Sequence, residues 1–147
     1  MPNNTSEHLK LNELLTSQRL AVLCTQHQGQ PYANLVAFST SEDFKVICFA
    51  TPRKTRKYDN IKQDGRVSLL VDDRENTAGD FTNAVAATAV GKAIEVEKPR
   101  ADIFGRYLGK HPELEPFAKS EDSAFFCVNV DSYIFVDNFQ HVTEIKP

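Results

Sequence analysis

Long hydrophobic runs are absent from this 147-residue sequence. No segment approaches the roughly 20 apolar residues that cross a bilayer as a helix. The polar start, residues 2–7, also lacks the apolar segment of a secretory signal peptide. We therefore expect a cytoplasmic protein with no membrane partner.

An excess of positive charge is missing as well. The formal net charge at pH 7 is −3, so the whole chain has no general attraction to nucleic acid or to anionic membrane surfaces. The sequence contains no glycine-rich nucleotide fingerprint, no P-loop and no serine nucleophile elbow. Nucleic acid is not an expected partner, and any basic cluster must act locally.

Cysteine and histidine are few and show no metal-ligand spacing. Cys24, Cys48 and Cys127 each lie in an apolar, strand-like run without a second Cys or His at such spacing. They are interpreted as small buried residues of a reducing compartment. The four histidines are scattered and are predicted at surfaces or turns. No metal site is expected, and no residue is assigned a catalytic role.

Tryptophan is absent, whereas phenylalanine is abundant. Ten of the aromatic side chains are Phe, and hydrophobic residues make up 41% of the chain. This length and content predict one domain over residues 1–147. About seven short apolar runs at close spacing predict a mostly β fold. We expect a closed or partly closed antiparallel barrel with a few short peripheral helices, a β-sandwich being the alternative.

The expected elements follow from apolar spacing and turn signals. Helices are predicted over 6–16, with Ser6 as a possible cap, over 56–63, and on both sides of His111-Pro112. Strands are predicted over 19–26, 32–40, 45–51, 66–71 and, with a bend or bulge at Gly91, 82–97. The runs 124–130 and 133–137 predict a hairpin that turns at Asp131-Ser132, and a last strand is expected over 141–145.

One segment combines charge and secondary structure in a way that indicates a ligand. Residues 49–57 read FATPRKTRK, so four cations in five residues follow a strand and precede a helical pattern. A threonine at this junction can cap the helix, and the free N–H groups and positive dipole end of a helix favour an anion. Arg56 and Lys57 would add charge-assisted hydrogen bonds. A phosphate site is predicted here, a solvated basic loop being the alternative.

The order of these features resembles the FMN-binding split-barrel family that includes pyridoxamine 5'-phosphate oxidase. The resemblance covers residues 11–145 and rests on Ala50-Thr51, on Thr55-Arg56-Lys57 after three loop residues, on Asn60-Ile61 and on the strand that starts at Gly65-Arg66. It implies FMN as the cofactor.

The resemblance also assigns positions to the cofactor site. Thr55, Arg56 and Lys57 would bind the phosphate, and Ala50 and Thr51 would offer backbone groups to the ribityl chain or ring. Asn34, Leu35 and Val36 would run past the isoalloxazine, although Asn34 could equally be a solvent-facing strand residue.

The resemblance further implies a homodimer whose subunits share the flavin groove, and a small-molecule electron donor or acceptor. Departures concern the substrate: Ala86 replaces a Gln of the oxidase, with Asn83 nearby, Ser39 replaces a Lys, and an Arg-x-His segment near the C-terminus is missing. We therefore expect a flavin-dependent oxidoreductase that does not oxidise pyridoxamine 5'-phosphate. A flavin carrier or sensor without enzymatic activity and a haem-binding barrel are the alternatives.

Overall fold

The computed structural model describes residues 5–147. Its elements lie close to those expected from the sequence, and most strand boundaries differ by one or two residues. The strands are β1 Leu20–His27, β2 Gln30–Thr40, β3 Val46–Pro52, β4 Arg66–Asp72, β5 Ala86–Glu95, β6 Ser123–Asp137 and β7 His141–Ile145. The helices are α1 Ser6–Ser17, α2 Arg56–Gln63, α3 Asp80–Asn83, α4 Ala101–Lys110, the 3₁₀ turn Pro112–Leu114 and α5 Glu115–Ala118.

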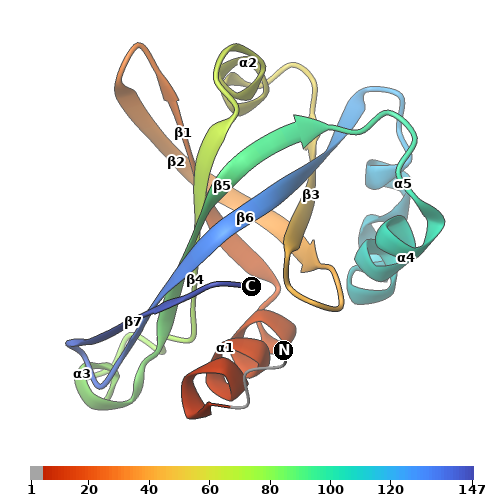
Figure 1. Cartoon of the computed structure of the whole chain (residues 1–147). Coiled ribbons are helices and arrows are strands. Elements are labelled where there is room, and N and C mark those ends of the chain that lie inside the picture. Colours follow the sequence, from red (N-terminus) through yellow and green to blue (C-terminus); the bar gives the residue numbers. More distant parts are fainter. Residues whose placement is uncertain (1–4) are drawn as a thin grey trace.

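The strands form one antiparallel sheet in the order β3-β2-β1-β4-β5-β6-β7 (Figure 1). A further antiparallel pairing of β3 with β6 closes the first six strands into a barrel, and β7 extends beyond it on β6. The mostly β barrel with short helices is thereby confirmed, and the sandwich alternative is wrong. Within residues 5–147, no helix is long and apolar enough to cross a membrane.

The predicted hairpin at Asp131-Ser132 is wrong, because β6 runs unbroken through these residues. The register shifts there: Val90 pairs with Ser132, but Gly91 pairs with Val130, so Asp131 is an extra residue in the ladder. A β-bulge of this kind changes which residues face inward. Even-numbered side chains of β6 enter the core before Asp131 and odd-numbered ones after it. In the sequence, the break that this bulge makes in the alternation of apolar and polar residues looks the same as the break that a turn makes.

Two smaller differences have local causes. The strand expected from residue 82 starts only at Ala86, because residues 80–83 form the short helix α3. The cap of α1 is Thr5 rather than Ser6, since the Thr5 side chain accepts a hydrogen bond from the His8 N–H. The irregularity expected at Gly91 is confirmed, because the register of β5 with β6 shifts between Val90 and Gly91. The extra residue, Asp131, lies on the partner strand β6.

Two apolar clusters stabilise the barrel. The inward side chains of the strands form the main core, which α1 closes with Leu11, Leu14 and Leu15. A second cluster lies outside the barrel wall, where α4 and α5 cover β3 and β6. Tyr107 of α4 is fully buried there against Phe125, with the ring centroids 5.5 Å apart.

The barrel wall opens between β2 and β3. In the described part of the chain these strands pair over three positions only, from Phe38 with Phe49 to Thr40 with Ile47. Beyond them, residues 30–37 of β2 pair with β1 alone, and residues 50–52 of β3 pair with β6 alone. Figure 1 shows the two strands spreading apart toward α2. We call this opening, bordered by residues 30–37 and 50–52, the split.

Candidate functional site

The N-terminus of α2 lies at the end of the split and is capped by Thr55, as the sequence predicted. The Thr55 hydroxyl accepts from the Tyr58 N–H at 3.3 Å and donates to the Pro52 carbonyl at 2.9 Å. The first N–H groups of a helix have no intrahelical acceptor. Since the cap uses only that of Tyr58, the N–H groups of Arg56 and Lys57 remain available to an anion.

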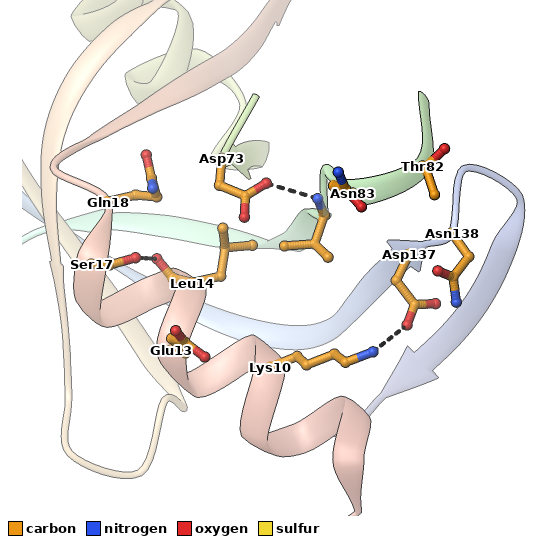
Figure 2. A pocket seen from close by; sticks show the side chains of 11 residues that line it. Lys10, Glu13, Leu14, Ser17, Gln18, Asp73, Thr82, Asn83, Asp137 and Asn138 are labelled. Carbon is orange, nitrogen blue, oxygen red and sulfur yellow. Dashed lines mark hydrogen bonds and ion pairs between the residues drawn. The ribbon is translucent and has the colours of Figure 1, made fainter. Parts of the chain in front are cut away.

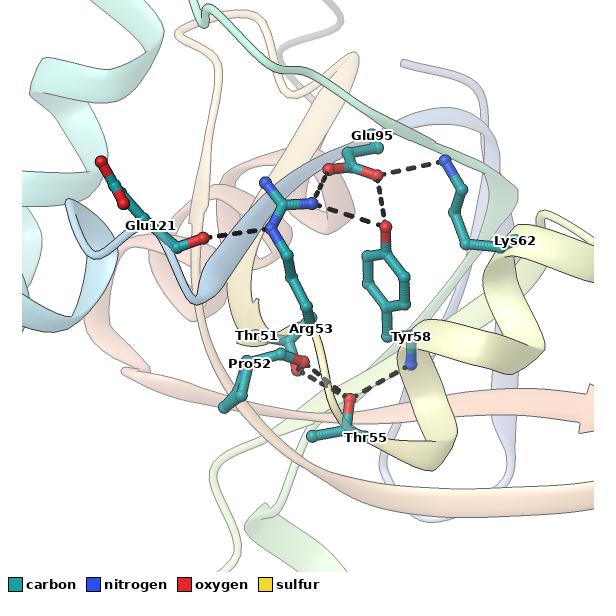
Figure 3. Close-up of polar contacts among 8 residues, drawn as sticks. All are labelled: Thr51, Pro52, Arg53, Thr55, Tyr58, Lys62, Glu95 and Glu121. Carbon is teal, nitrogen blue, oxygen red and sulfur yellow. Dashed lines mark hydrogen bonds and ion pairs between the residues drawn. The ribbon is translucent and has the colours of Figure 1, made fainter.

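We call residues 52–57 the basic loop. Its four cations, Arg53, Lys54, Arg56 and Lys57, differ in what they contact. The Arg53 guanidinium bonds the Glu95 carboxylate at 2.5 Å and the Glu121 carbonyl at 3.3 Å (Figure 3). Arg56 instead lies over the ring of Tyr32, 5.1 Å from its centroid. Arg53 is therefore neutralised by Glu95 although it also lines the cavity beside the basic loop, and the sequence alone could not distinguish it from the other cations.

Glu95 is the centre of a polar cluster that joins β5 to α2. Besides Arg53, its carboxylate accepts from Lys62 at 3.1 Å and from the Tyr58 hydroxyl at 3.0 Å (Figure 3). Burial would raise the pKa of Glu95, but hydrogen bonds from these three side chains outweigh it and hold that pKa below its usual range. Glu95 is thus ionised at neutral pH and fixes both the basic loop and α2.

Lys57 differs from Arg53 because it has a half-buried side chain and no acidic partner. Within residues 5–147 it makes no ion pair. Burial lowers its pKa, because the partly desolvated ammonium has lost water without gaining a counter-charge. An anion beside the start of α2 would supply that counter-charge.

A cavity of roughly 820 Å³ lies beside the basic loop. Its walls come from the β1–β2 hairpin, the loop and α2, and they include Thr55, Arg56, Tyr32 and His27. The volume falls within the range of about 300–1,000 Å³ that is common for sites of cofactors and small molecules. Tyr32 was not assigned to the site from the sequence. Its position two residues before Asn34, on the same face of one strand, was the available signal.

The other predicted site residues border the split in different ways. Asn34 lies on the β2 edge, and its buried side-chain oxygen has no hydrogen-bond partner within residues 5–147. Its neighbours alternate, with Leu35 outward and 61% exposed and Val36 buried in the core. Ala50 and Thr51 are buried on the β3 edge, so they can reach a ligand mainly through backbone groups.

A second, smaller cavity of roughly 330 Å³ lies between α1, α3 and the β6–β7 turn. Figure 2 shows Lys10 directed at Asp137, with the ammonium 2.9 Å from the carboxylate. His141 lies 2.7 Å from the other oxygen of Asp137, and Lys10 together with His141 holds the Asp137 pKa below its usual range. Asn83 lines this cavity and not the one beside the basic loop.

Asn60 anchors α2 to the barrel and thereby positions the basic loop. Its amide donates to the Thr25 hydroxyl at 3.0 Å, and both side chains are buried. We expect Asn60→Ala to lower the free energy of unfolding by about 1–3 kcal/mol, because the Thr25 hydroxyl loses its buried partner. Urea unfolding measures this change.

The control for Asn60 removes both polar partners. The double variant Asn60→Ala/Thr25→Val should be destabilised by less than the sum of the single variants, because it leaves no orphaned polar group. Strict additivity of the two changes would contradict a direct hydrogen bond between Asn60 and Thr25.

Residues 8–137 match the family model described as pyridoxamine 5'-phosphate oxidase. A haem-binding protein from Mycobacterium smegmatis has a similar structure, with a TM-score of 0.84 and 14% identity over 98% of this chain and 59% of that one. The haem storage protein HutZ from Vibrio cholerae has a TM-score of 0.73 and 15% identity over 94% and 93%.

An FAD-binding protein from Mesorhizobium loti is also similar, with a TM-score of 0.66 and 18% identity over 86% of this chain and 90% of that one. At such identities the likeness extends to the fold alone. A search of curated protein sequences finds no significant match.

Proposed function

The chain belongs to the pyridoxamine 5'-phosphate oxidase family, and from this premise we propose that it binds FMN along the split and acts as a flavin-dependent oxidoreductase. Lys57 carries the proposal. It is a half-buried cation with no counter-ion in the described residues, and it lies next to free N–H groups at the start of α2. A phosphate is the anion that this combination of charge and backbone donors suits.

The split offers groups for the rest of the cofactor. The unpartnered oxygen of Asn34 is an acceptor for a ring N–H, and such buried orphans are rare in proteins. The edges of residues 34–36 and 50–51 carry backbone groups that the β2–β3 ladder leaves unused. FMN has both a ring N–H and a phosphate for these two ends of the site, whereas riboflavin lacks the phosphate.

Bound flavin would supply the electron transfer, and the chain would supply binding and access for a small-molecule donor or acceptor. The substrate differs from pyridoxamine 5'-phosphate in this proposal. Ser39 is buried, and His141 is engaged with Asp137, so neither offers a cation to a substrate phosphate. We place the activity in the cytoplasm, where free cysteines such as those of this chain persist.

Haem is a second candidate, because two of the structurally similar proteins are named for it and His27 stands in the cavity wall. The absorption spectrum of the purified protein, before and after titration with FMN and with haemin, tests both. Flavin bands that persist after gel filtration support the proposal. A haem band with no retained flavin would contradict it.

We also propose a homodimer that uses the outer face of β1, β2 and β4. Val22 lies opposite both Leu35 and Leu70 on this face. Leu20 and Leu35 are more than half exposed. The centre of this face is uncharged, and the charged outward residues Arg66 and Asp72 lie at the two ends of β4. The uncharged outward positions are Leu20, Val22, Cys24, Ala33, Leu35, Ala37, Ser68 and Leu70. Apolar patches of this extent are typical of interaction sites.

Leu20→Lys is expected to convert the dimer into a monomer, because the interface would have to desolvate a charge. Sedimentation velocity at micromolar concentration measures the change. Leu9→Lys is the matched control, since Leu9 is equally exposed but lies on α1. A monomeric parent protein with flavin bound would refute the proposed dimer.

A further inference from the structure

The fold brings together two cysteines that are 79 positions apart in the sequence. Cys48 of β3 and Cys127 of β6 are directly opposed in the ladder that closes the barrel. Their sulfur atoms are 2.8 Å apart, and both thiols are free. From the sequence alone each cysteine is interpreted as a small buried residue, because no local pattern reveals a partner on another strand.

We propose that Cys48 and Cys127 form a redox-active dithiol, which a hydroperoxide oxidises to a disulfide across the β3–β6 seam. This site is independent of the flavin site, and it requires no ligand in the split.

The backbone already has the spacing of a disulfide. Directly opposed residues of antiparallel strands have Cα atoms about 4.5–5.5 Å apart, and disulfides join Cα atoms about 4.4–6.8 Å apart. Both side chains project to the outer face of the wall, into the cluster covered by α4 and α5. The bond can therefore form without a change in strand register.

The two thiols differ in a way that assigns their roles. Cys127 is partly exposed, whereas Cys48 is buried. The hydrogen bond from Cys48 lowers the pKa of Cys127, while the same contact and then burial raise the pKa of Cys48. Since the thiolate is the nucleophile, Cys127 is the attacking residue and Cys48 is the resolving one.

The chemistry balances in two steps. The Cys127 thiolate attacks the terminal oxygen of the hydroperoxide, the O–O bond breaks, and the sulfenic acid and an alcohol form once the leaving alkoxide takes a proton. The Cys48 thiol then attacks the Cys127 sulfur, the S–O bond breaks, and water leaves. Two thiols lose two electrons and two protons, and one hydroperoxide is reduced to an alcohol and water.

The test is a thiol count on the whole protein after exposure to hydrogen peroxide. The dose is set so that Cys24 stays unmodified, and thiols are then titrated in denaturant. We expect the free thiols to fall from three to one per chain, with the mass of two hydrogens lost and a peptide that links residues 48 and 127. Dithiothreitol should restore all three thiols.

Variants separate the proposed pair from general oxidation. In a Cys24→Ala background the count should fall from two to zero. Adding Cys48→Ser should leave Cys127 as a sulfenic acid that dimedone traps. Oxidation should also raise the melting temperature by about 10 °C, because the bond closes a long loop. Three persistent thiols in the parent protein, or added oxygen on Cys127 without loss of hydrogen, would overturn the proposal.

Discussion

Lys57→Ala is expected to weaken FMN binding by roughly ten- to a hundredfold, because one charge-assisted hydrogen bond is worth about 1.5–3 kcal/mol. The affinity for riboflavin should not change, since riboflavin has no phosphate to contact Lys57. Quenching of flavin fluorescence measures both affinities. The parent protein should accordingly prefer FMN over riboflavin.

The apo form of the same variant distinguishes a binding role from a structural one. Lys57 is partly desolvated and has no acidic partner in the described residues, so its removal should not lower the melting temperature of the apo protein. Lys98→Ala makes the same charge change on an exposed loop between β5 and α4 and should leave FMN binding unaltered. Equal affinity of the parent protein for FMN and riboflavin would refute the phosphate site.

Gly91→Ala is expected to destabilise the fold by about 3 kcal/mol or more, the largest effect on stability foreseen here. A Cβ atom at this position would lie 2.1 Å from the Asn129 carbonyl oxygen and 3.1 Å from a methyl group of Val128. The obstructing atoms belong mainly to the β6 backbone beside the bulge, so they cannot rotate away as a flexible side chain would. Strands β5 and β6 would have to separate locally.

Urea unfolding measures this loss, with Gly105→Ala as the matched control. An added Cβ at Gly105 meets no atom within 4 Å, and the residue lies inside α4. Alanine favours a helix more than glycine does, so this control should gain up to about 1 kcal/mol. Equal stability of the two alanine variants would contradict the close approach at the bulge.

Local signals explain what the sequence could predict. The helix over 56–63 has a threonine cap and an Asp-Gly end, and both signals lie within a few residues of it. The basic loop was recognised in the same way, from neighbours along the chain. Thr55 therefore lies where the pattern placed it.

Contacts between distant segments were not predictable in this way. The ion pair of Arg53 with Glu95 joins residues 42 positions apart, and no local pattern separates Arg53 from Lys57. The Cys48–Cys127 pair depends on barrel closure. The bulge at Asp131 appeared as a turn, because one inserted residue and a loop interrupt the apolar alternation alike.

The bulge also determines which changes of length β6 can accept. Phe126 and Val128 face the core in the first half of the strand, and Tyr133 and Phe135 face it in the second half. Asp131 is the extra residue, so deleting it would restore an uninterrupted alternation in which all four side chains still face the core, whereas a one-residue deletion farther from the bulge would turn the residues between the two points to the other face. The bulge is therefore the place where β6 can lose one residue without inverting either half of the strand.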